Sequence, residues 1–339
     1  MSPSGVGVLP LARMPVNSTR ARAAWEIPNA CGPIRSMTVD WIWIPITVSA
    51  AAAQTLRNAA QRRLTTELGT LGATLVRFLY GLPFAAAWLA IVRAWTGAAL
   101  PHWTAMFGVW VVLGAVSQIV ATAFLLRAMQ ERSFALGVAY SKTEIIQVAV
   151  FGLVFLGDRL ATPTVVAVLL GTLGVLLLSP ADPARPLRAL VAGWSTRPAL
   201  FGLASGAGFA LASVAFRGAA LQLSAAPFAL AAATTLVTAL ALQTVLLGGY
   251  LLVRARRVVR AVLTLWRPSL FAGLMGAAAS AGWFTAFALE PAAHVRTLGL
   301  SELVFTYVLS RRWFREHFTR LERLGMALLV AGLVLVTLG

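Results

Sequence analysis

Residues 162–179 read TPTVVAVLLGTLGVLLLS, a stretch without a single charged side chain. An α-helix needs about 20 mostly apolar residues to cross the hydrocarbon core of a bilayer. Uncharged runs of at least that length also cover residues 101–126, 218–253 and 268–289. The whole chain of 339 residues is 59% hydrophobic and 12% charged, and its mean hydropathy is +0.81. These features predict an all-α integral membrane protein whose main partner is the lipid bilayer.

The formal net charge of +17 comes from arginines that lie between the apolar runs, as in RARRVVR (254–260) and SRRWFREHFTRLER (310–323). Such clusters usually face lipid head groups. No nucleic-acid module is recognisable, so we expect no nucleic-acid partner. The single cysteine, Cys31, excludes an internal disulfide framework, and the three histidines lack zinc spacing. No hydrolase or phosphate-loop motif occurs either, so we expect neither an enzyme nor a cofactor.

Ten apolar segments are predicted, beginning near residues 39, 69, 103, 133, 161, 198, 226, 267, 292 and 322. Residues 1–36 are rich in Pro, Gly, Ser and Arg and are interpreted as a disordered basic tail, or as residues that precede the true start at Met37. The expected divisions are a first five-helix repeat (37–180), an inter-repeat loop (181–197) and a second five-helix repeat (198–339).

The two halves resemble each other. Sliding the chain by 158 residues places TEII at Thr143 on SELV at Ser301, so that Glu144 meets Glu302. Offsets of 159 and 160 align further segments of the two halves. Because each repeat has an odd number of helices, the second copy must enter the membrane inverted. Two inverted repeats are typical of secondary transporters, which bind their substrate near the bilayer midplane between the halves.

Residues 135–179 (ALGVAYSKTEIIQVAVFGLVFLGDRLATPTVVAVLLGTLGVLLLS) resemble the end of an EamA-type repeat of the drug/metabolite transporter superfamily. Residues 296–336 look like the second copy, and LVRFLYGLPF at Leu75 is similar to the second helix of the first. The resemblance covers about residues 37–339. It implies two EamA-type repeats whose fourth and ninth helices line a central pathway, with both ends of the chain in the cytoplasm. The arginine-rich loops after the first, fifth, seventh and ninth helices instead favour an N-terminus on the outside.

The segment YSKTEIIQ (140–147) places ionisable groups inside an apolar helix expected over about residues 133–157. A charge at that depth costs at least ~2.5–3.5 kcal/mol, so it should face protein or water rather than lipid. At about 100° per residue, Lys142 and Glu144 should point some 160° apart and should not pair. Glu144 shares a polar face with Tyr140, Ser141 and Gln147, whereas Lys142, the only lysine of the chain, shares an apolar face.

Candidate pathway residues are therefore named on both repeats: Glu144, Lys142, Ser141, Tyr140, Gln147 and Gln118 from the first, and Glu302, Ser301, Trp283 and Arg296 from the second. Each of these residues could instead have a purely structural role. The glutamates could pair with Arg77 or Arg296 or donate a hydrogen bond between helices, Lys142 could make a fixed interhelical bond, and Gln118 and Trp283 could simply pack.

The expected function is secondary active transport by alternating access. The transporter is expected to export a small polar or amphiphilic metabolite or drug, with protons as the candidate coupling ion. A flippase for a lipid-linked substrate with the same fold is the alternative. A Glu144/Glu302 pair would suit a cationic or zwitterionic substrate, while Lys142 could engage a carboxylate. The expected location is the bacterial inner membrane.

Overall fold

The structure is a computed structural model that describes residues 34–131, 138, 141–142, 144–157, 162–178, 197–313 and 320–338. The chain forms two compact units, Met1–Trp41 and Ile42–Gly339, and the described part of the first unit is only the beginning of helix α1. Residues 1–33 of the expected tail and residues 181–196 of the expected inter-repeat loop lie outside the described residues.

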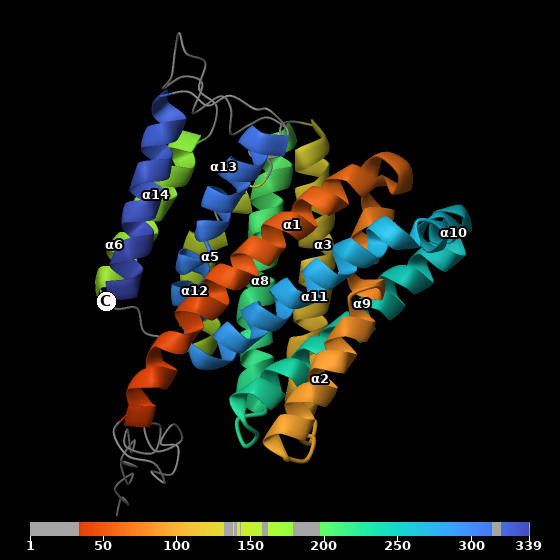
Figure 1. Cartoon of the computed structure of the whole chain (residues 1–339), viewed down its shortest axis with the longest axis horizontal. Helices are drawn as coiled ribbons and strands as arrows, with labels where there is room; N and C mark the ends of the chain where they lie inside the picture. Colours follow the sequence, from red (N-terminus) through yellow and green to blue (C-terminus); the bar gives the residue numbers. More distant parts are fainter. Residues whose placement is uncertain are drawn as a thin grey trace, which may run out of the picture. The chain divides into compact units, whose positions relative to one another are not determined.

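Every element in the described ranges is a helix. The elements are α1 (Ile34–Leu79), α2 (Leu82–Thr96), α3 (Ala105–Glu131), α5 (Glu144–Phe151), η1 (Gly152–Leu156), α6 (Thr162–Leu178), α8 (Arg197–Gln222), α9 (Phe228–Arg254), α10 (Arg256–Thr264), α11 (Trp266–Leu289), α12 (Ala292–Leu298), α13 (Ser301–Trp313) and α14 (Arg320–Leu338) (Figure 1). The π-helical η1 continues α5 directly.

The described residues do not show the ten expected membrane spans. Five helices of the described residues are long and apolar enough to cross a bilayer: Trp41–Thr96, Ala105–Glu131, Leu200–Gln222, Phe228–Arg254 and Trp266–Leu289. The first two expected segments fall within one of these helices, which bends at Gly69 (φ 67°, ψ 174°). The expected segments near residues 133 and 292 contain interruptions, so their helical pieces are short. Helix α6 has only 17 residues.

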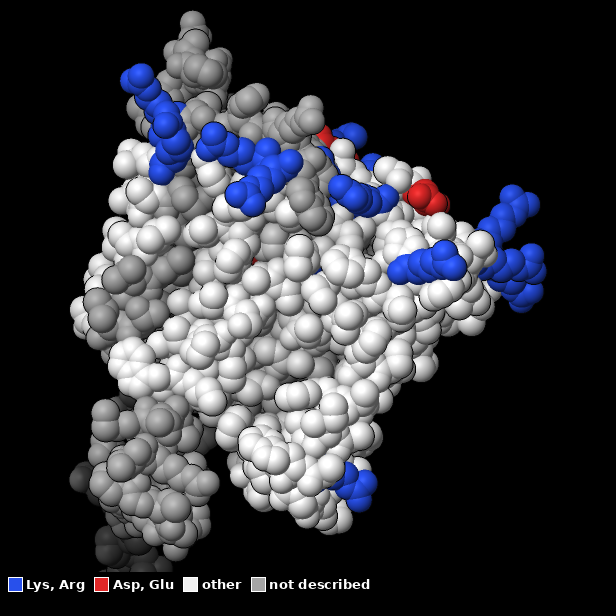
Figure 2. Space-filling view, viewed as in Figure 1, with Lys and Arg blue, Asp and Glu red and all other residues white. Residues whose placement is uncertain are grey.

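The outer surface of the long helices is apolar. On α3, five exposed residues follow helical spacing and form one face, with 37–59% of each side chain exposed: Val109, Val112, Leu113, Val116 and Val120. Figure 2 shows a broad belt almost free of charged side chains, with most of the visible basic side chains towards its margins, including a group over α10. A protein with an apolar surface and polar side chains in its interior is stable in lipid and not in water. The prediction of a helical membrane protein is thus confirmed.

The helices of the larger unit pack in a set of pairs. Helix α3 lies along α8, α6 lies along α14, α2 packs on α9, and α5 contacts both α8 and α12 (Figure 1). Glycines allow the closest approaches. A Cβ added to Gly208 on α8 would lie 2.9 Å from the Cβ of Ala121 on α3, and one added to Gly282 on α11 would lie 2.7 Å from the Cβ of Ala50 on α1.

Candidate functional site

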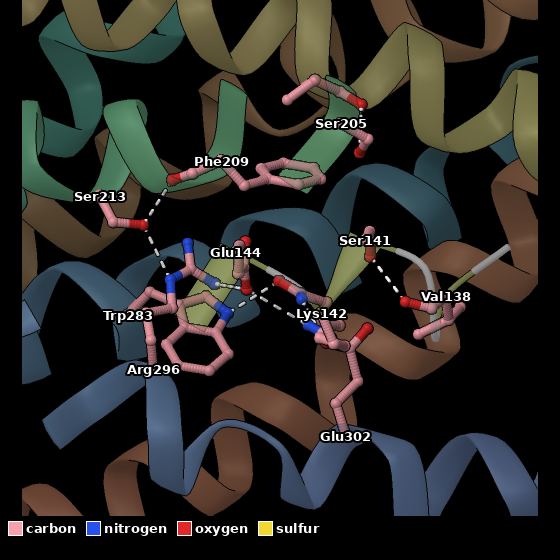
Figure 3. Close-up of polar contacts among 12 residues, drawn as sticks. Val138, Ser141, Lys142, Glu144, Ser205, Phe209, Ser213, Trp283, Arg296 and Glu302 are labelled. Atoms are coloured by element: carbon pink, nitrogen blue, oxygen red, sulfur yellow. Dashed lines mark hydrogen bonds and ion pairs between the residues drawn. The ribbon is translucent and has the colours of Figure 1, made fainter. Parts of the chain in front are cut away.

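Charged and polar side chains gather in the interior of this apolar bundle. We call them the central cluster, which consists of Gln54, Arg57, Asn58 and Arg77 on α1, Lys142 and Glu144 before and at the start of α5, Trp283 on α11, Arg296 on α12 and Glu302 on α13. All nine side chains are buried. Figure 3 shows the part of the cluster around Glu144 and Glu302.

Both glutamates stand in the first turn of a helix that follows an interruption. Helix α5 begins at Glu144, directly after a turn at Lys142, and α13 begins with Ser301 and Glu302 after a turn at Gly299 and Leu300. The N-terminal end of a helix carries partial positive charge and unsatisfied N–H groups, so it favours a carboxylate. The two interruptions therefore place both acids where a buried negative charge is least costly.

Glu302 is surrounded by hydrogen-bond donors. Gln54 Nε2 donates to Glu302 Oε2 at 2.6 Å, and Asn58 Nδ2 donates to Glu302 Oε1 at 2.8 Å. Lys142 Nζ makes an ion pair with the same Oε2. A buried carboxylate needs this kind of compensation, because an unpaired charge in a low-dielectric interior is costly. Glu302 is thus held from two different segments of the chain.

Lys142 also lies near Glu144, contrary to the expectation from helix geometry. Its Nζ is 3.6 Å from Glu144 Oε1. The expectation assumed a continuous helix through residues 140–147, but Lys142 lies in a turn, so the 100° rotation per residue does not apply there. For the same reason, Lys142 does not sit on an apolar helix face but between the two carboxylates (Figure 3).

Glu144 has weaker polar contacts than Glu302. Arg296 Nη1 lies 3.6 Å from Glu144 Oε1, the same oxygen that faces Lys142. The second oxygen, Oε2, is buried and has no hydrogen-bond partner among the described residues. Glu144 therefore retains one oxygen that can accept a further hydrogen bond.

Arg296 is fixed by a polar and an aromatic contact. Its Nε donates to Ser213 Oγ on α8 at 2.8 Å, and its guanidinium lies 4.7 Å from the ring centroid of Trp283 (Figure 3). The Trp283 indole N–H donates in turn to Gln54 Oε1 at 2.8 Å. A cation held over an indole ring is stabilised by the ring quadrupole, more so when desolvated. Trp283 thus connects Arg296 to the Gln54 side of Glu302.

Arg57 and Arg77 bring two further cations into the cluster. Arg57 Nη2 donates to Asn58 Oδ1 at 2.7 Å, and Arg77 Nη1 donates to Thr122 Oγ1 on α3 at 3.0 Å. These partners are neutral. Among the described residues, the cluster contains four cations (Arg57, Arg77, Lys142 and Arg296) and two carboxylates (Glu144 and Glu302).

None of the remaining predicted residues that the structure describes forms a hydrogen bond to Glu144 or Glu302. Ser141 Oγ is buried and donates to Val138 O at 2.7 Å, which is a bond within its own helical turn. Ser301 Oγ is buried without a partner among the described residues. Gln118 accepts a hydrogen bond from Gln243 Nε2 at 2.8 Å, and this contact does not reach the glutamates. Gln147 is half-buried, and Tyr140 lies outside the described residues.

Sequence reasoning missed the contribution of α1. Gln54, Arg57, Asn58 and Gln61 recur with the spacing i, i+3, i+4 and i+7 in QTLRNAAQ, so they form one polar stripe on a helix. All four are buried. A polar stripe on an otherwise apolar helix faces the protein interior in a membrane, and this signal could have identified the donors to Glu302.

Comparisons with known proteins inform the fold alone. No family model matches the chain, and no curated protein matches it. A solved structure described only as "Crystal structure of protein" matches with a TM-score of 0.57 and 15% sequence identity, over 90% of this chain and 96% of the other. At this identity the match indicates a shared fold along nearly the whole length of both chains.

Proposed function

We propose that the chain is a secondary active transporter of the EamA-like type in the drug/metabolite transporter superfamily, located in the bacterial inner membrane and exporting a small polar or amphiphilic solute. The central cluster carries this proposal. Burying six ionisable side chains inside an apolar bundle is costly, and in membrane proteins such groups mark substrate or ion pathways. Two of them begin helices after an interruption, as at the binding sites of many secondary transporters.

The proposal includes ten helices in two inverted repeats, and the packing supports it. If a pseudo-twofold axis relates the halves, contacts should occur in reciprocal pairs. Ala50 packs on Gly282 as Gly208 packs on Ala121. Ala50 and Gly208 are 158 residues apart, and Ala121 and Gly282 are 161 apart. These spacings agree with the 158 residues that separate Glu144 from Glu302.

The helix pairs follow the same pattern. Helix α2 packs on α9 and α6 packs on α14, and in each pair the two partners lie at equivalent places in the two halves. Short pieces such as α5 with η1, and α12 with α13, would then be the two parts of discontinuous spanning helices. Non-helical backbone at membrane depth is tolerated where it is covered by protein, as it is around Lys142 and around Gly299.

The proposed mechanism is a change of partners at Lys142. Its ammonium lies between Glu302, which has two further donors, and Glu144, which has one unpartnered oxygen. A proton or a substrate group that reaches Glu144 would weaken the attraction of Glu144 for Lys142 and Arg296. Because these residues belong to segments on either side of two helix interruptions, such a change can bias one half of the bundle against the other.

Transport in proteoliposomes tests the proposal. The full chain would be reconstituted and offered a panel of labelled amino acids, sugar derivatives, organic acids and amphiphilic drugs, with and without a pH gradient. A fluorescent lipid-linked probe in the same vesicles tests the flippase alternative. We expect saturable solute transport that Glu144→Gln abolishes. The variant should stay folded, because the ionic contacts of Glu144 with Lys142 and Arg296 are both long, at 3.6 Å. The matched control is Glu131→Gln, at a partly exposed residue that pairs with Arg127. Vesicles that move none of the solutes would refute the proposal.

A further inference from the structure

Two arginines of the central cluster form no direct ion pair with a carboxylate among the described residues. Lys142 pairs with Glu302, and Arg296 is the other cation at Glu144. Arg57 and Arg77 then remain. Their hydrogen-bond partners in the described part of the chain are the neutral oxygens of Asn58 and Thr122, and the Arg77 guanidinium also lies 5.5 Å from the ring centroid of Phe78. The side chains are 1% and 2% exposed, and Nη1 of Arg57 and Nε of Arg77 have no hydrogen-bond partner there.

The aliphatic stems of both side chains lie over the same glycine. Both cover Gly276 of α11, where an added Cβ would be 3.3 Å from Arg57 Cδ and 3.3 Å from Arg77 Cγ. Gly276 thus leaves room for the stems of two arginines at one helix crossing. Bringing two desolvated cations together opposes folding unless a negative charge compensates them.

Helix packing alone does not require arginine at this crossing. The corresponding crossing of the other half is that of α3 with α8, where the ring of Phe216 covers Gly114. Arg57 and Phe216 are 159 residues apart, and Gly114 and Gly276 are 162 apart, so the positions correspond. An apolar ring fills the space in one half and a guanidinium fills it in the other. The charge of Arg57 is therefore an addition to what packing needs.

We infer that Arg57 and Arg77 bind an anionic group of the transported solute, a carboxylate or a phosphate. This inference rests on the proposed function and names the substrate class for the same site. Guanidinium groups match both anions, because their N–H groups form paired, charge-assisted hydrogen bonds with two oxygens of the anion. The free Nη1 of Arg57 and Nε of Arg77 would be among the donors. Lys142 and Arg296 already face Glu144 and Glu302, so Arg57 and Arg77 are the cations of the cluster that remain for an anion.

The test is the thermal stability of the purified full chain in detergent, measured with increasing concentrations of succinate, glycerol 3-phosphate and inorganic phosphate. Glycerol and putrescine serve as neutral and cationic probes. We expect a saturable rise in Tm with at least one anion, and none with glycerol or putrescine. Succinate and glycerol 3-phosphate distinguish a carboxylate from a phosphate ligand.

Variants connect this response to the two arginines. Arg57→Gln and Arg77→Gln should weaken the anion response about tenfold or more, because each removes a charge-assisted bond. Without ligand, both variants should be at least as stable as the unmodified chain, since each reduces the excess of buried positive charge in the cluster. Arg256→Gln, at an exposed arginine on α10, removes the same charge at the surface and should leave the response unchanged. Gly276→Ala keeps both charges but displaces the two stems, and should also weaken the response.

Several results would overturn the inference. These are the absence of any anion response, an equal response in the Arg57 and Arg77 variants, or a fall in ligand-free stability on losing either arginine. Transport of a neutral or cationic solute at unchanged rate by the variants would refute the inference and leave the transporter proposal standing. Failure of the unmodified chain to transport any solute would instead refute the transporter proposal.

Discussion

Glu302→Gln is expected to destabilise the protein far more than Lys142→Met, although the two residues form one ion pair. In the described central cluster, four cations face two carboxylates. Losing Glu302 leaves four cations facing one carboxylate, and it leaves the buried Lys142 ammonium with only the contact to Glu144 at 3.6 Å. Losing Lys142 reduces the excess of positive charge, and Glu302 keeps the hydrogen bonds from Gln54 and Asn58.

The magnitudes follow from this difference. Removing one partner of a buried pair typically costs about 3–5 kcal/mol, and we assign that range to Glu302→Gln. At a few degrees per kcal/mol, its Tm should fall by on the order of 10 °C. For Lys142→Met we expect a loss of about 1–2 kcal/mol, comparable to one hydrogen bond to a charged group. The double variant should be more stable than Glu302→Gln alone, because it restores the original excess of charge.

Thermal unfolding of the purified protein in detergent measures all four proteins of this double-variant cycle, and the coupling energy isolates the pair. Glu131→Gln is the control, because its pair with Arg127 is solvent-accessible and should contribute under about 1 kcal/mol. The reasoning is wrong if Lys142→Met proves as destabilising as Glu302→Gln. It is equally wrong if the effects of the two substitutions simply add.

Three other predictions concern packing, aromatic contacts and access. In the same unfolding assay, Gly208→Ala should destabilise the protein by about 1–3 kcal/mol, because its Cβ would overlap a neighbouring helix. The control is Gly108→Ala, which should be neutral or slightly stabilising because no atom lies within 4 Å of the added Cβ. Trp283→Phe keeps an aromatic ring but loses the indole hydrogen bond, so we expect a loss of about 1–2 kcal/mol, and an unchanged Tm would contradict the contact. Ser141→Cys in a Cys31→Ser background should react with a membrane-impermeant thiol reagent faster during transport than at rest. The reason is that Ser141 is buried in this structure. Equal rates would argue against alternating access at this residue.

The sequence determined the class of the protein and the places where its helices begin. Uncharged runs such as residues 162–179 predict membrane helices before the fold is known, because hydropathy is a local property of the chain. Helices α3, α8, α9 and α11 begin within about two residues of the expected positions, since Pro, Gly and Arg separate the runs. Lys142, Glu144 and Glu302 were recognisable because an ionisable residue within an apolar run is costly.

Tertiary structure alone decided how those residues meet. The turn at Lys142 overrode the helix geometry that separated it from Glu144, because two buried carboxylates on neighbouring segments compensate its charge. The orientation of the α1 stripe with Gln54, Arg57 and Asn58 likewise depended on which helices cover it. A polar stripe in an apolar helix predicts that it is buried but does not identify its partner. That partner, Glu302, lies 244 residues from Asn58 along the chain, and only the packed bundle brings the two together.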